Sequence, residues 1–175
     1  MQKRYWFTLL MAAVGIASAC NSSSSSKPAG SAPGAGPNEA AFKDYMGRSK
    51  ATEAELRLRQ LVKANNVAAV DTTAYVEGQT ALTPAQSCCA QNAEGKGKCA
   101  PDAATWNDPV WQKLNFSVDM PHYFQYQYTG TATSYKIIAV GDLDCDGTTI
   151  TYTVDGNFDA GNPTFIMTKP AADAD

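Results

Sequence analysis

The sequence predicts an α+β domain in which a long N-terminal amphipathic helix packs on an antiparallel sheet of about four strands. Three observations lead to this class. A helical apolar period runs from about Asn38 to Val70, and short runs of alternating apolar and polar residues follow Lys113. A turn-rich segment between the two holds three cysteines. A helix followed by consecutive hairpins is an order typical of α+β proteins.

Residues 1–19 have the features of a secretory signal peptide: a short basic start, an apolar run and three small residues. Because these small residues end on Cys20, the pattern resembles the lipobox of bacterial lipoproteins, with Ala17 where leucine is usual. That resemblance implies a lipid on Cys20. The alternative is an ordinary signal peptide with an incidental cysteine.

Residues 20–37 combine Cys20 with a tether of Ser, Gly, Ala and Pro that has almost nothing to bury. Residues 38–175 then form one modest folded domain, which is all that a chain of 175 residues allows. The net charge is −3, and no basic cluster stands outside the mixed-charge helix. Nucleic acid is therefore not an expected partner.

The predicted helix has one apolar stripe and a charged opposite face. The stripe residues are Phe42, Tyr45, Met46, Ala54, Leu58, Leu61, Val62 and Ala68. Glu53 and Glu55 stand four residues before Arg57 and Arg59, the favourable order for ion pairs. Exposed pairs contribute little, so packing of the stripe must supply most of the stability.

Four cysteines remain after lipidation, and in an exported domain they predict two disulfides. A bridge between the adjacent Cys88 and Cys89 is disfavoured by disulfide geometry. Two pairings of these residues with Cys99 and Cys145 stay open. A zinc site built from the four thiols is the alternative, and the oxidising export route and the lack of a CxxC knuckle speak against it.

Five segments alternate as strands do, and each is bounded by Pro, Gly, Asn or Asp. They are residues 114–119, 122–129, 134–144, 148–155 and 164–169. In the second of them, Phe124, Tyr126 and Tyr128 share one face. A half-buried antiparallel sheet fits this pattern, with one face against the helix stripe.

Asp142, Asp144, Asp146 and Gly147 form D-x-D-x-D-G, the opening of an EF-hand-like calcium loop. The twelfth position is Thr153, which excludes a complete EF-hand. We favour a hairpin turn with its carboxylates in solvent, and calcium binding is the alternative.

No arrangement of residues points to an enzyme. A single histidine, His122, cannot form a zinc triad, and we expect it to be structural or exposed to solvent. Glu53 and Glu55 lie two positions apart on a solvated helix face, so they do not face each other. Trp106 and Trp111 are expected in the core rather than stacked on sugars.

Several of these segments together resemble type IV pilins of a Gram-negative branch with a cysteine-bearing loop. They are the RSK-x-x-EA core of the helix, the W-x-x-x-x-W-x-x-L-x-F run and the G-D-L-D-x-D-G turn, in one order over residues 42–154. The resemblance implies a head in which the N-terminal helix lies on an antiparallel sheet beside a disulfide-bearing region.

The N-terminus departs from a prepilin. Trp6 stands where the leader glycine would be, Met11 replaces the assembly glutamate, and the apolar run stops at the lipobox. We therefore expect a non-enzymatic protein of the Gram-negative cell envelope, anchored by lipid to a membrane. The outer membrane or cell surface is favoured, because Asn21 rather than aspartate follows Cys20.

Such a protein would act by contact, as an adhesin or an accessory of pilus subunits or pilus machinery. The alternatives are a diverged pilin that builds a filament and a calcium- or glycan-binding module.

Overall fold

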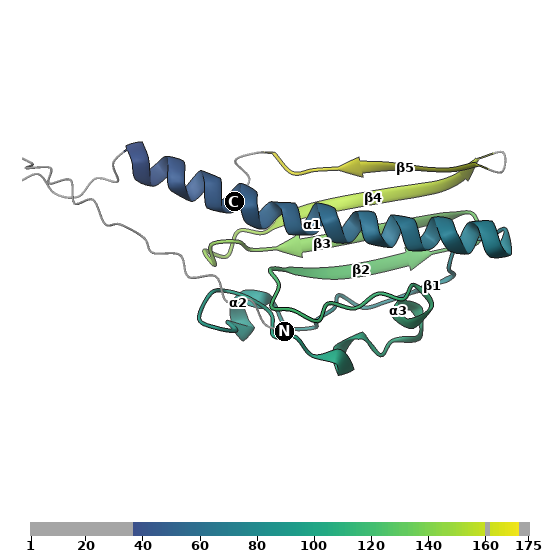
Figure 1. The fold of residues 1–175 in the computed structure, drawn as a ribbon, viewed down its shortest axis with the longest axis horizontal. Helices are drawn as coiled ribbons and strands as arrows, with labels where there is room; N and C mark the ends of the chain where they lie inside the picture. The colour runs from purple at the N-terminus through teal and green to yellow at the C-terminus, as the bar shows by residue number, and fades with distance from the viewer. Residues whose placement is uncertain (1–36, 160–161, 172–175) are drawn as a thin grey trace, which may run out of the picture. The chain divides into compact units, whose positions relative to one another are not determined.

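A 36-residue helix, α1 (Pro37–Thr72), lies across one face of an antiparallel sheet in the computed structural model, which describes residues 37–159 and 162–171 (Figure 1). The five strands are in sequence order: β1 (Gly78–Gln79), β2 (Phe124–Gly130), β3 (Ser134–Gly141), β4 (Ile150–Asp159) and β5 (Asn162–Thr168). The α+β class is confirmed, and the sheet has five strands rather than four.

Three short helices lie in the segment between β1 and β2. They are α2 (Cys88–Gln91), the 3-10 helix η1 (Ala103–Trp106) and α3 (Pro109–Lys113). Asp102 and Asp108 cap the last two, because their carboxylates accept hydrogen bonds from the backbone N–H groups of Ala104 and Val110. The turn-forming residues of this segment therefore cap its short helices and form the tight connections between them.

The alternation of the strands buries one face of the sheet. Tyr126, Ala139 and Tyr152 lie side by side across β2, β3 and β4 and are buried. On the opposite face, Lys136 and Thr151 are exposed. This is the one-sided burial that antiparallel sheets commonly show, and it confirms the predicted pairing of the sheet with a helix.

The central part of α1 buries the predicted stripe on β3, β4 and β5. Leu58 and Leu61 are fully buried. At the first turns the prediction is wrong: Phe42, Tyr45 and Met46 are 62%, 68% and 38% exposed. These turns of α1 extend beyond the ends of the strands, so they have no sheet beneath them (Figure 1).

Two details of the strand prediction are also wrong. Residues 114–119 alternate between buried and exposed, as predicted, but they pair with no strand in the described part of the chain. The sheet instead gains β1, which pairs with β2 through Gly78 and Gln79. A segment can therefore bury alternate side chains on one side without joining a ladder.

Trp106 and Trp111 form a buried aromatic cluster with Phe116 and Tyr126 at the β2 side of the sheet. The Trp106 ring centroid is 5.7 Å from that of Trp111 and 5.3 Å from that of Phe116, in edge-to-face arrangements. The Trp111 Nε1–H donates to Thr83 Oγ1 at 3.1 Å. Both tryptophans are core residues, as the sequence predicted.

Candidate functional site

The four cysteines form the two predicted disulfides, and the pairing is Cys88–Cys99 and Cys89–Cys145. The sequence left this choice open. The first bridge closes the loop after α2, and the second joins α2, through Cys89, to the turn between β3 and β4. With sequence separations of 11 and 56, chain entropy assigns about 3 and about 4 kcal/mol to the two cross-links.

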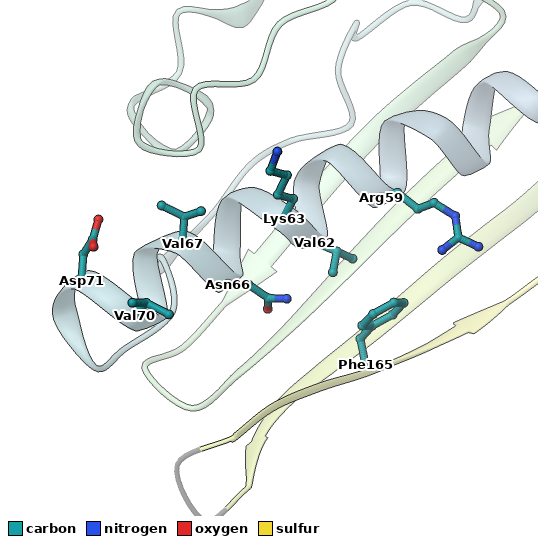
Figure 2. Close-up of a pocket in the computed structure, with 8 residues that line it drawn as sticks. All are labelled: Arg59, Val62, Lys63, Asn66, Val67, Val70, Asp71 and Phe165. Atoms are coloured by element: carbon teal, nitrogen blue, oxygen red, sulfur yellow. The ribbon is translucent and has the colours of Figure 1, made fainter.

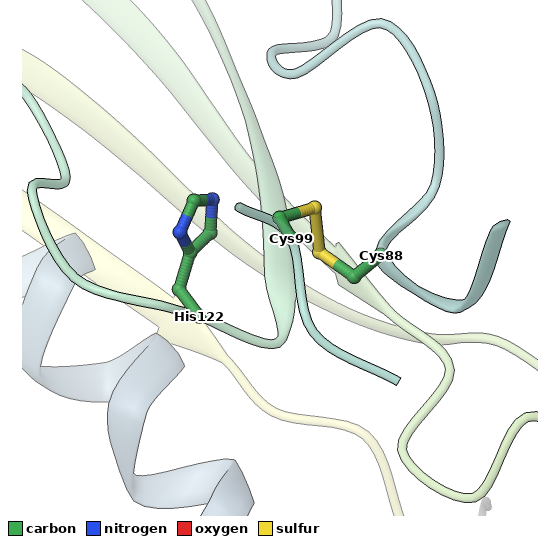
Figure 3. A group of neighbouring side chains, drawn as sticks. All are labelled: Cys88, Cys99 and His122. Carbon is green, nitrogen blue, oxygen red and sulfur yellow. A yellow bond between two sulfur atoms is a disulfide. The ribbon is translucent and has the colours of Figure 1, made fainter. Parts of the chain in front are cut away.

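His122 lies against the first bridge (Figure 3). It pairs with Cys99 as in an antiparallel ladder: Cys99 N–H donates to His122 O at 2.8 Å, and His122 N–H donates to Cys99 O at 3.3 Å. Cys88, Cys99 and His122 are 4%, 0% and 1% exposed. His122 is therefore buried, which excludes the solvent-exposed position that the sequence also allowed.

The His122 ring is buried, and one of its two nitrogens makes a hydrogen bond. Its Nδ1 lies 3.0 Å from the carbonyl oxygen of Met120, so Nδ1 carries the donated proton. Nε2 is buried and has no hydrogen-bond partner among the described residues. Burial lowers the pKa of His122, and the Met120 bond raises it by a smaller amount.

The three aspartates of the D-x-D-x-D-G motif lie in the turn between β3 and β4, with carboxylate oxygens within 4.8 Å of one another. Each also accepts a backbone N–H. Asp142 binds Cys145 N at 2.7 Å and Gly147 N at 3.1 Å, and Asp146 binds Thr148 N at 2.6 Å. The Thr148 bonds lower the pKa of Asp146. These bonds support the hairpin-turn interpretation, and calcium binding stays the alternative.

Glu53 and Glu55 have different partners. Glu53 Oε1 accepts Tyr123 N–H at 3.0 Å in a half-buried site, where desolvation raises the pKa of this carboxyl. The prediction that Glu53 lies on a solvated face is therefore wrong. Glu55 forms an ion pair with Lys169 at 2.7 Å, so it joins α1 to the segment after β5. The two carboxylates therefore contact segments that adjoin the strands, Glu53 just before β2 and Glu55 just after β5.

A groove of about 440 Å³ runs between the C-terminal half of α1 and the outermost strand, β5 (Figure 2). Its lining is Arg59, Val62, Lys63, Asn66, Val67, Val70, Asp71 and Phe165. Among these lining residues, Val67, Val70 and Phe165 are 53%, 77% and 41% exposed. The groove therefore presents apolar side chains to solvent.

Sequence reasoning missed this groove, although two signals were present. Val67 and Val70 are apolar but lie off the helix stripe, and Phe165-Ile166-Met167 is a run of three apolar residues in the last predicted strand. A half-buried strand requires only every second residue to be apolar. The surplus apolar residues marked the exposed surface.

A second hollow of about 1060 Å³ lies along the N-terminal half of α1. Its lining includes Phe42 and Met46 of α1, Leu143 of the turn before β4, and Ile150 and Tyr152 at the start of β4. Two of the three exposed residues of the predicted stripe, Phe42 and Met46, therefore line this hollow.

No protein-family model, curated protein or solved structure matches this chain. The fold and the two disulfides define only a structural class, an α+β domain with one long helix on a five-stranded antiparallel sheet. Cys20 and the predicted signal peptide and tether lie outside the described residues. Within the described residues, no helix is both long and apolar enough to cross a membrane.

Proposed function

We propose that this chain is a lipid-anchored, non-enzymatic protein with a pilin-like head that acts by contact with another protein at the cell envelope. Adhesion and association with pilus components are the two forms of contact that fit. The observation that carries the proposal is the exposed apolar surface formed by β5 and the α1–β5 groove. Exposed apolar patches on soluble domains commonly mark interaction sites.

The geometry of β5 favours an extended segment as the partner. In the described sheet β5 pairs only with β4, so its other edge offers backbone N–H and C=O groups to a further strand. Phe165 lines the groove, and Ile166, the next residue, is 72% exposed. A partner strand would gain ladder hydrogen bonds along β5, and an apolar side chain would fill the groove beside Phe165.

The test is site-specific photo-cross-linking in cells with a photoreactive residue in place of Ile166. Met120, ahead of β2, is the matched control, because it is also a large apolar residue and is 60% exposed. We expect a discrete adduct from position 166, loss of that adduct when Phe165→Arg is added, and no such adduct from position 120. Equal adducts from both positions, or none from position 166, would refute the proposed surface.

A further inference from the structure

We propose that Cys88, Cys99 and His122 bind Zn²⁺ when the Cys88–Cys99 disulfide is reduced. The sequence placed zinc only on four thiols and gave His122 no part in it. In the structure, one histidine lies beside the two cysteines of a single disulfide (Figure 3). This inference is independent of the proposed contact function.

The three donor groups already lie together. Both sulfurs and a His122 ring nitrogen are within 4.8 Å of one another. Cys99 and His122 are fixed by their paired backbone bonds, and Cys88 begins α2 with Ser87 as its N-cap. Tetrahedral zinc holds two thiolates about 3.7 Å apart, so once the S–S bond is broken only a modest separation of the sulfurs is needed.

The His122 tautomer suits a metal ligand. Nδ1–H donates to the Met120 carbonyl at 3.0 Å, which leaves the lone pair on Nε2. Nε2 is buried and has no hydrogen-bond partner among the described residues, so a metal ion would satisfy it. A backbone carbonyl that orients the second ring nitrogen is a common support for zinc-binding histidines.

The charge of the three ligands suits a divalent metal ion. Two thiolates and a neutral imidazole around Zn²⁺ give a complex of zero net charge, which a buried site tolerates better than a charged one. Thiolate and imidazole are both ligands that zinc prefers. The fourth position falls to water. The Gln91 Nε2–H, which donates to Cys99 Sγ at 3.4 Å, would stabilise the thiolate of Cys99.

The chemistry has two steps. A dithiol reductant gives two electrons and two protons to the Cys88–Cys99 bond, which breaks to two thiols while the reductant closes its own disulfide. Zn²⁺ then replaces the two thiol protons, which are released to water. The metal would hold the loop after α2 closed in the form of the chain that lacks the disulfide.

A rival set exists at the second bridge, where Cys89, Cys145 and Asp142 also lie within 4.8 Å of one another. Cys145 and Asp142 are less buried than the proposed ligands, and both Asp142 oxygens already accept backbone N–H groups. We therefore assign zinc to the His122 set and use the rival set as the internal control.

The experiment uses the full chain with Cys20→Ser, which removes the fifth thiol, in excess reductant. Cysteines are alkylated with and without Zn²⁺, and the modified positions are identified by mass spectrometry. We expect zinc to protect Cys88 and Cys99 and to leave Cys89 and Cys145 reactive. Equal protection of all four cysteines, protection of Cys89 and Cys145 alone, or no protection would overturn the proposal.

Co²⁺ titration of the same reduced chain supplies a second measurement through the cobalt–thiolate charge-transfer absorbance. We expect one Co²⁺ per chain, displaced by Zn²⁺. His122→Gln should weaken binding by at least about tenfold, because it removes a direct ligand, whereas Asp142→Asn should leave it unchanged. The reverse pattern, or binding unaffected by His122→Gln, would contradict the assignment.

Discussion

Removal of the Cys89–Cys145 disulfide by the paired change Cys89→Ala and Cys145→Ala should strongly destabilise the domain. This bridge spans 56 residues, and the chain-entropy relation for a loop of that length gives about 4 kcal/mol. Cys145 is exposed and Cys89 is half-buried, so the change removes little packing. The loss should therefore come almost entirely from the cross-link.

Urea unfolding followed by tryptophan fluorescence measures this loss, because Trp106 and Trp111 are buried in the core. With a slope of about 1.5 kcal/mol per M, a loss of about 4 kcal/mol lowers the midpoint by about 2.7 M. The control is the same pair of proteins in reductant with a metal chelator, where both lack the bridge and their midpoints should coincide. A shift below about 1 M, or a shift that persists in reductant, would refute the reasoning.

Three further predictions concern the helix, the buried histidine and the aspartate turn. Leu58→Ala should cost about 3 kcal/mol in unfolding free energy, because Leu58 is fully buried on the sheet, while Phe42→Ala, at a residue 62% exposed, should cost less than about 0.5 kcal/mol. Burial lowers the pKa of His122 from 6.5, so between the lowered pKa and pH 6.5 the unfolded chain binds a proton that the folded chain does not. The contribution of His122 to the free energy of unfolding is therefore complete above pH 6.5 and is lost as the pH falls through that window. Urea midpoints measured against pH should fall less in His122→Phe than in the unsubstituted chain. Asp142→Ala should cost about 1 kcal/mol, because Asp142 accepts two backbone N–H groups, and Asp144→Ala should cost less, because Asp144 accepts one at 3.2 Å; thermal unfolding of both variants checks the order.

The sequence predicted the core residues correctly wherever the apolar period falls on a part of the chain that the sheet covers. Leu58 and Leu61 are buried because the sheet lies beneath them, and Trp106 and Trp111 are core residues as expected. Phe42 and Tyr45 follow the same helical spacing but are exposed. A helical period indicates which side of α1 is apolar, and it carries no information on where the sheet ends.

What the sequence missed or left open involves contacts between residues far apart in the chain. Nothing local in Gly78-Gln79 marks a strand, and β1 exists because that segment runs beside β2. The choice of Cys99 for Cys88 depends on how the loop folds back. The position of His122 beside that bridge depends on the same backbone pairing, which residue spacing cannot reveal.

The central claim is a lipid-anchored head that acts by contact and is not a filament subunit. Mass spectrometry of the mature N-terminus, after expression in a Gram-negative host with intact pilus machinery, tests it most directly. The account predicts a chain that begins at a lipid-modified Cys20, with no filaments of this chain in sheared surface material. A mature N-terminus at Phe7, the residue after Trp6 at the position of the prepilin leader glycine, with filaments built from this chain, would contradict it.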